Sequence, residues 1–248
     1  MRRFRALAFD VGGSVFDWKG SISQVLQRLA VAQGVEVDAQ QFALEWRRQM
    51  FLVLVELRRG KLPDTTAEQI LPLALQRVLP GYAQVNFDDI AIRRLLQAWH
   101  TMKARKDFPP ALARLKEKYM VMVLSILNFS IITDSSKASG ITWDGVISCE
   151  FLGHYKPEPS AYLEGCARMG FAPAEVCLVA VHPYDLVSAK AVGMGAAFVE
   201  PQFAEPDISL QGLAQLPQPE DYDFYARDFE ELADMMCSGV ENYRALIG

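Results

Sequence analysis

Cysteine is scarce in this chain of 248 residues, and its four cysteines are far apart. None of them forms a C-x-x-C pair, the spacing that is typical of zinc sites and redox motifs. Dispersed cysteines of this kind are usually reduced thiols in a cytoplasmic protein. We therefore expect neither a disulfide framework nor a zinc site.

Long apolar runs and an excess of basic residues are missing as well. No segment has the roughly 18 consecutive apolar residues of a membrane-spanning helix, and the first apolar run stops at Asp10, too early for a signal peptide. The net charge is −5, whereas nucleic-acid binding needs a basic face that displaces counterions. We expect a cytoplasmic protein with no membrane or nucleic-acid partner. A small-molecule carboxylate substrate is compatible with this charge, because one buried arginine can bind it.

Short β-rich runs alternate with helical stretches over much of the chain. The runs cover residues 5–11, 121–127, 145–150, 176–181 and 195–201. This alternation is typical of an α/β fold, and we expect a Rossmann-like parallel sheet with helices on both faces. From Gln202 onward, prolines and acidic residues indicate a surface loop, followed by a last helix near residues 229–233.

A block of four helical stretches, with no strand pattern, follows the first β-rich run. Asp38, Thr65 and Asp88 are the expected N-caps of its last three helices. The sequence predicts an all-helical cap domain at residues 18–103, inserted into an α/β core domain of residues 1–17 and 104–248. A cap placed over the strand ends can exclude water from a reaction.

Polar side chains follow the predicted strands, and ligands of open α/β sheets bind at the carboxyl ends of strands. Asp10 ends the first run, and Ser14 follows it across a glycine turn. A carboxylate at this place can act as a nucleophile that forms an ester. It can equally accept hydrogen bonds from the N–H groups of its own turn, and the residues alone leave both possibilities open.

Two further polar residues stand near strand ends. Ser125 ends the second run, where its hydroxyl can bind either a substrate oxygen or the backbone. Lys156 precedes two prolines that stiffen the chain, so it can compensate a buried carboxylate or remain a solvated loop lysine. Tyr162, six residues later, can turn toward the site or pack in a helix.

A third place of this kind is the segment VAVHPYDL, where His182 and Asp185 follow an apolar run and precede a helix. A carboxylate at a helix N-terminus is favourable whatever its function, so helix capping is the alternative to a catalytic Asp185. His182 can be a hydrogen-bond donor in the site or a polar loop residue. All these clusters are expected at one edge of one sheet.

The order of these motifs resembles that of the haloacid dehalogenase-like hydrolase superfamily, and within it the (S)-2-haloacid dehalogenases. The resemblance covers about residues 4–203, through AFDVGGSVFDWKGS, EWRRQMF, VLSILN, ITWDGVISCE, YKPEPSAY and VAVHPYDLVSAKAVGMGAAFVEP. It implies hydrolytic dehalogenation of a short 2-haloalkanoic acid, which gives the 2-hydroxy acid and halide. It implies no cofactor and no metal ion.

The resemblance also implies catalytic roles. Asp10 matches the nucleophile that attacks the halogen-bearing carbon, forming an aspartyl ester that water then hydrolyses. Ser14 stands where the family usually has threonine, and Lys156 and Tyr162 match the family's lysine and tyrosine. Asp185 matches the aspartate that helps to hold or activate the hydrolytic water.

The implied substrate-binding residues come from both domains. Arg47, in the helical block, matches the arginine that faces the substrate and helps to accept the halide. Ser125 matches the residue that binds the substrate carboxylate, together with the backbone N–H groups of Val11, Gly12 and Ile126.

Three positions depart from the family pattern. Gly12 stands where the phosphatases of the superfamily have a second aspartate, and where the dehalogenases have an aromatic residue that walls the pocket. We expect the missing ring to open the pocket or to leave it underpacked. Ile126 replaces an asparagine that stabilises the halide, and one such donor is worth on the order of 3 kcal/mol. His182 replaces an asparagine found in some members.

Two other functions stay open at this point. One is a phosphatase that depends on Mg²⁺ and uses a general acid other than the usual second aspartate, although Gly12 at that position counts against it. The other is a catalytically weak relative that binds a carboxylate. Residues 51–57 are more apolar than one buried helix face requires, which indicates a homodimer interface or an enclosed core helix.

Overall fold

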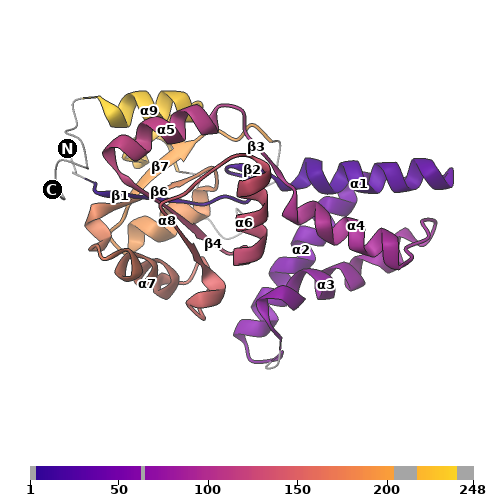
Figure 1. Cartoon of the computed structure of the whole chain (residues 1–248). Helices are drawn as coiled ribbons and strands as arrows, with labels where there is room; N and C mark the ends of the chain where they lie inside the picture. Colours follow the sequence, from indigo (N-terminus) through magenta and orange to yellow (C-terminus); the bar gives the residue numbers. More distant parts are fainter. Residues whose placement is uncertain (1–3, 63–64, 204–216, 239–248) are drawn as a thin grey trace.

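A six-stranded parallel sheet forms the centre of the larger part of the molecule. The computed structural model describes residues 4–62, 65–203 and 217–238. In the sheet the strand order is β5-β4-β1-β6-β7-β8 (Figure 1). The strands are β1 (Ala6–Phe9), β4 (Met120–Ser125), β5 (Gly145–Ser148), β6 (Val176–Ala180), β7 (Gly195–Val199) and β8 (Phe224–Ala226). The predicted α/β fold class is confirmed.

Helices cover both faces of this sheet, because β1 is apolar on both sides. Leu7 and Phe9 face the hydrophobic cluster beneath α5 (Phe108–Lys118) and α9 (Phe229–Cys237). Ala6 and Ala8 belong to the second cluster, under α7 (Pro159–Met169) and α8 (Pro183–Ala191). Figure 1 shows the two helix pairs on opposite sides of the sheet. Such two-sided burial is typical of parallel strands.

The remaining helices of this part of the chain are short or lie at its border with the cap. α6 (Phe129–Ala138) follows β4 and contacts the last helix of the cap. Single 3-10 turns occur at Cys149–Phe151, Pro173–Glu175 and Pro219–Asp221, and another lies in the helical block at Leu79–Tyr82.

The helical block folds as four helices beside the sheet (Figure 1). They are α1 (Trp18–Gln33), α2 (Ala39–Arg58), α3 (Ala67–Val78) and α4 (Asp89–His100). Asp38 and Asp88 cap α2 and α4, because their carboxylates accept from Gln41 N at 2.9 Å and Ala91 N at 2.7 Å. The third expected cap is wrong by one residue: α3 starts after Thr66, whose backbone N–H donates to the Gln69 side chain.

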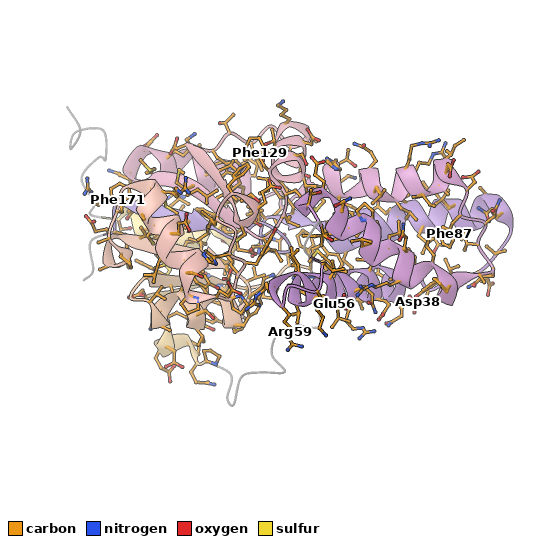
Figure 2. The ribbon with its side chains drawn as sticks, turned by 90° about the horizontal axis from the view of Figure 1, so that it is seen from below. Asp38, Glu56, Arg59, Phe87, Phe129 and Phe171 are labelled. Carbon is orange, nitrogen blue, oxygen red and sulfur yellow. The ribbon has the colours of Figure 1, made fainter. Side chains whose placement is uncertain are left out.

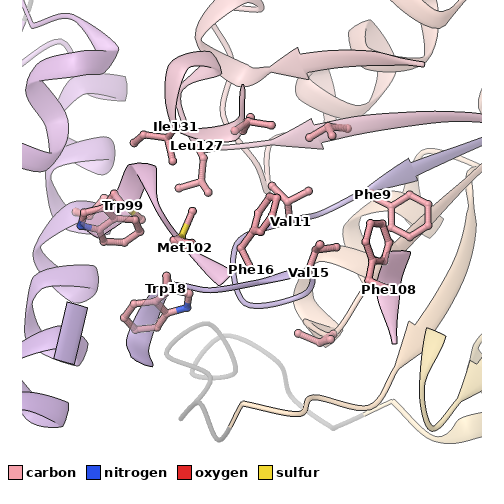
Figure 3. Packing of buried hydrophobic residues seen from close by; sticks show 14 of the residues in the cluster. Phe9, Val11, Val15, Phe16, Trp18, Trp99, Met102, Phe108, Leu127 and Ile131 are labelled. Carbon is pink, nitrogen blue, oxygen red and sulfur yellow. The ribbon is translucent and has the colours of Figure 1, made fainter. Parts of the chain in front are cut away.

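A two-stranded antiparallel ribbon joins the helical block to the core. It consists of β2 (Phe16–Asp17) and β3 (Lys103–Ala104). We propose this ribbon as the boundary between core and cap. The hydrophobic cluster passes through the boundary without a break, from Phe9 and Phe108 to Trp18 and Trp99 (Figure 3). The cap therefore packs against the core through apolar side chains as well as through the ribbon.

Helix α2 carries the apolar stretch at residues 51–57. Figure 2 shows α2 between Asp38, at the outer end of the cap, and Arg59, near the core. Val53 and Leu54 are buried within the cap, whereas Leu52 is 40% exposed. The stretch is thus only partly enclosed, and the homodimer stays a prediction.

The C-terminal part differs from the expectation in one respect. A short strand, β8, lies in the region that was expected to be loop, and it extends the sheet by pairing with β7. Residues 204–216 of the expected loop lie outside the described residues. The last helix of the described residues is α9, and none of their helices is long and apolar enough to span a membrane.

Candidate active site

A small cavity lies between the carboxyl edge of the sheet and the cap. Asp10, Ser125 and His182 reach this edge from the neighbouring strands β1, β4 and β6. The cavity measures about 20 Å³, which is room for roughly one water molecule. Its walls are formed by Asp10, Gly12, Ser125, Ile126, Leu127, His182 and Tyr184 of the core, and by Trp18, Arg47, Met50 and Trp99 of the cap.

The Asp10 carboxylate is held by Ser14 and is almost fully buried. The Ser14 hydroxyl donates to Asp10 Oδ2 at 2.7 Å, while its oxygen accepts from Val181 N at 3.2 Å. The second bond points the hydroxyl hydrogen toward the carboxylate. Within the described part of the chain, no other group donates a hydrogen bond to Asp10. The turn-acceptor alternative for Asp10 is therefore not supported by the geometry.

Lys156, Asp185 and Tyr162 form a buried network beside Asp10. Lys156 Nζ lies 2.8 Å from Asp185 Oδ2 and 3.7 Å from Asp10 Oδ1. The Tyr162 hydroxyl donates to Asp185 Oδ1 at 2.5 Å. Burial acts to lower the pKa of Lys156, but the negative charges of Asp185 and Asp10 outweigh it and raise that pKa. Burial raises the pKa of Tyr162, so its hydroxyl stays a donor.

Arg47 of the cap and His182 of the core meet in the wall of the cavity. Arg47 Nη2 lies 3.3 Å from His182 Nε2, and the guanidinium carbon lies 4.6 Å above the centre of the Trp18 ring. Stacking on an aromatic face holds such a cation in place. His182 Nε2 is also 3.1 Å from Gly12 O and 3.7 Å from Asp10 Oδ2.

Ser125 is engaged with the backbone and still faces the cavity. Its oxygen accepts from Leu127 N at 3.2 Å, which is the backbone role considered from the sequence. Its hydroxyl hydrogen has no acceptor among the residues that the structure describes, so it remains able to donate to a ligand. Ile126 also lines the cavity, whereas Val11 is buried and is not among the lining residues.

The space beside Gly12 is filled by another side chain. A Cβ atom added to Gly12 would lie 3.3 Å from Leu127 Cδ1. The structure therefore differs from the expectation that the missing ring opens the pocket. Leu127 closes it from the neighbouring strand end, so little room is left.

Sequence reasoning missed the aromatic contribution of the cap. Trp18 and Trp99 stack with their ring centres 6.0 Å apart, and both line the cavity. Their Nε1 atoms are buried and have no hydrogen-bond partner in the described ranges, whereas Trp46 Nε1 donates to Leu71 O at 3.0 Å. Buried donors without a partner are uncommon, and each needs an explanation such as a bound water, an ion or a catalytic role. The position of Trp18, directly after the loop that follows Asp10, is the one sequence signal that was available.

The described ranges contain no group of three His, Cys, Asp or Glu side chains that could hold a metal ion. Asp10 and Asp185 instead share the ammonium group of Lys156.

Comparison with known proteins places the chain in a family. Residues 4–193 match the family model described as haloacid dehalogenase-like hydrolase. The chain belongs to this family. Its fold class and the family predicted from the motifs are thereby confirmed.

Individual relatives within the haloacid dehalogenase-like hydrolases are similar over most of the chain. The (S)-2-haloacid dehalogenase 1 of Pseudomonas sp. (strain CBS-3) is 28% identical over 229 residues, which are 88% of this chain and 97% of the relative. The solved L-2-haloacid dehalogenase PA0810 is 29% identical with a TM-score of 0.83, and the match covers 95% and 100% of the two chains. The defluorinating L-2-haloacid dehalogenase Rha0230 is 30% identical with a TM-score of 0.79, and the match covers 94% of this chain and 95% of that one.

Proposed function

We propose that this protein hydrolyses the carbon–halogen bond of a short 2-haloalkanoic acid and releases the 2-hydroxy acid and halide. The observation that carries the proposal is the buried Asp10 carboxylate, which Ser14 orients in the wall of a cavity that Arg47 also lines. The printed names of its relatives support the same substrate class.

In the first step, an oxygen of Asp10 attacks C2 of the substrate and the halide leaves. The products are an aspartyl ester and a free halide ion. A displacement of this kind needs the leaving group opposite the nucleophile, which directs the halide toward the cap wall. Arg47 supplies the positive charge there, and the indole N–H of Trp18 is a further donor. The Ser125 hydroxyl is placed to bind the substrate carboxylate.

The second step is hydrolysis of the ester by water, which restores Asp10. Lys156 stays charged beside Asp10 in this reaction, since its pKa is raised. Its ammonium lies between two carboxylates, the position that a divalent cation would otherwise take. We therefore propose that neither step needs a metal ion.

Substrate entry requires motion in this scheme. The cavity has room for roughly one water molecule, which is less than a haloacid needs. The cap must swing away, or side chains such as Leu127 must shift, before the substrate binds. Closure around a bound substrate then excludes water during the displacement.

Halide release from 2-chloropropionate and from haloacetates, measured with EDTA present, tests the proposal. We expect multiple turnovers, and none for Asp10→Asn. A single turnover in H₂¹⁸O should leave the heavy oxygen in the peptide that contains Asp10, because water attacks the ester carbonyl. If no haloacid of such a panel releases halide, the proposal is wrong. Tight binding of small carboxylates without turnover would then support the weak carboxylate-binding relative, for which Ile126 in the cavity wall is the motivating observation.

A further inference from the structure

The side chain of Leu127 limits the space beside Asp10. Leu127 lines the cavity and is only 5% exposed. Its Cδ1 lies 3.3 Å from the position that a Cβ atom would take at Gly12, two residues after Asp10. Figure 3 shows the side chain reaching from the end of β4 toward the boundary with the cap. Leu127 therefore stands next to the place where C2 of a substrate meets Asp10.

The backbone of Leu127 is held on both sides by buried serines. Its N–H donates to Ser125 Oγ at 3.2 Å, and its carbonyl oxygen accepts from Ser148 Oγ at 2.7 Å. The two serines are partners in the pairing of β4 with β5, and both are fully buried. Leu127 therefore cannot retract from the cavity unless these hydrogen bonds break. Its side chain is also part of the hydrophobic cluster between core and cap, where close packing resists displacement.

The cap side of the cavity can yield more easily. Arg47 and Met50 both belong to α2, so they move away with the cap when it opens. The Met50 side chain is unbranched and adapts its shape to what it contacts. Movement of the cap thus makes room for the halogen, which departs toward that wall. It makes no room on the side of Leu127, which stays with the core.

The geometry of the displacement decides what this fixed wall does. The attacking oxygen and the halogen lie on one line through C2, and the other three substituents of C2 spread out around that line. One of them is the carboxylate, for which the Ser125 hydroxyl is available. The other two are hydrogen atoms in a haloacetate, whereas one is an alkyl group in every longer 2-haloalkanoic acid. An alkyl group needs an apolar wall. The core supplies this wall through Ile126 and Leu127, and Leu127 is the one that reaches Gly12.

We propose that Leu127 is a specificity-determining residue that favours haloacetates over acids with an alkyl group on C2; this inference rests on the proposed function. A methyl group on C2 would have to share the space that the Leu127 side chain already fills. A hydrophobic pocket distinguishes ligands that differ by one such carbon by about 10–200-fold in kcat/KM. The preference should therefore depend on the size of residue 127 and not on the cap.

Halide release from chloroacetate and from the better enantiomer of 2-chloropropionate tests the proposal. The quantity to compare is the ratio of the two kcat/KM values in the wild type and in Leu127→Ala. The intrinsic reactivity of the two acids cancels in this comparison, because it is the same for both proteins. We expect the variant to shift the ratio toward 2-chloropropionate by about 10-fold or more. Leu127→Val should shift it in the same direction by less, and it serves as the main variant if Leu127→Ala folds poorly by circular dichroism.

Leu115→Ala is the matched control. Leu115 is buried in the same hydrophobic cluster, but it lies on α5 and does not line the cavity. Its loss should lower stability as the loss of Leu127 does and leave the ratio unchanged. Binding of the two reaction products, measured by titration calorimetry, gives a readout that needs no turnover. The wild type should bind glycolate more tightly than lactate, and Leu127→Ala should lose this preference.

Two results would overturn the inference: a higher kcat/KM of the wild type for 2-chloropropionate than for chloroacetate, or the same ratio in the wild type and both Leu127 variants. Failure of the wild type to release halide from any haloacid would instead overturn the proposed function. In that case, a preference for glycolate that Leu127→Ala abolishes would still support Leu127 as the residue that limits the size of the ligand.

Discussion

Lys156 and Asp185 form an ion pair in which Nζ and Oδ2 lie 2.8 Å apart and both side chains are almost fully buried. A buried pair of this kind contributes little net stability compared with apolar residues, but removal of one partner leaves an unpaired buried charge. The pair therefore serves the site by fixing one ammonium group beside Asp10.

The first prediction concerns the loss of this ammonium group. Lys156→Met should lower the free energy of unfolding by about 3–5 kcal/mol, because Asp185 stays buried without its partner. The double variant Lys156→Met/Asp185→Leu should recover much of that stability and remain inactive. Urea unfolding at neutral pH measures both effects. Equal stability of the wild type and the single variant would contradict the assignment of a charged pair.

The same pair predicts how stability depends on pH. The pKa of Lys156 is raised in the folded state, although burial alone would lower it, because Asp185 and Asp10 are negative. Its stabilising contribution is thus fully present below the ordinary pKa of lysine, and it is lost as pH rises through the folded-state pKa. Wild-type stability should fall more steeply than that of Lys156→Met in unfolding experiments above about pH 10.

The second prediction separates two buried tryptophans of the cap. Trp18→Phe removes an N–H that has no partner within the described residues, so stability should change little. Halide should bind roughly 10-fold more weakly, since a hydrogen bond to a charged group is worth about 1.5–3 kcal/mol. Trp46→Phe is the control: it breaks a bond to Leu71 O and should lower stability by about 1 kcal/mol without changing halide binding. Inhibition of turnover by added bromide reports the affinity, and identical inhibition constants for the two variants would argue against Trp18 as a donor.

The strand-end residues could be predicted from the sequence because parallel strands end at one edge. Once the alternation of β and α was recognised, Asp10, Ser125 and His182 had to lie close together. The place of Trp18 and Trp99 in the cavity wall could not be predicted in this way. Which face of its helix turns Trp99 toward the core depends on tertiary packing. Strand β8 was missed for a similar reason: its three residues form the edge strand of the sheet, and their place there depends on pairing with β7.

Details of side-chain packing could not be predicted from the sequence either. The substitution at Gly12 was visible, but the side chain that compensates for it comes from β4's end and is set by the register of β1 on β4. That Asp185 has a donor on each oxygen could likewise be seen only once Tyr162 was placed.

The third prediction tests whether Leu127 substitutes for the ring missing at Gly12. Gly12→Phe alone should lower stability by about 1–3 kcal/mol or more, because the new side chain collides with Leu127. Leu127→Ala alone should cost about 2–5 kcal/mol through the cavity that it leaves. The double variant should be more stable than the sum of the two predicts, by a coupling of about 0.5–3 kcal/mol. Thermal unfolding of all four proteins gives this coupling, and strict additivity would show that the two positions do not share the space.

The fourth prediction is a gain of activity. Ile126 lines the cavity but donates no side-chain hydrogen bond, whereas Ile126→Asn would add an amide donor in the same wall. A donor aimed at a developing anion is worth about 10²–10³ in rate, so the rate of the halide burst should rise, up to roughly 100-fold. Ile126→Leu keeps the wall apolar and should leave the burst unchanged. Only the halide-forming step should respond, because the halide has already left when water hydrolyses the ester. A variant that accelerates both steps equally, or neither of them, would show that the halide does not depart past this position.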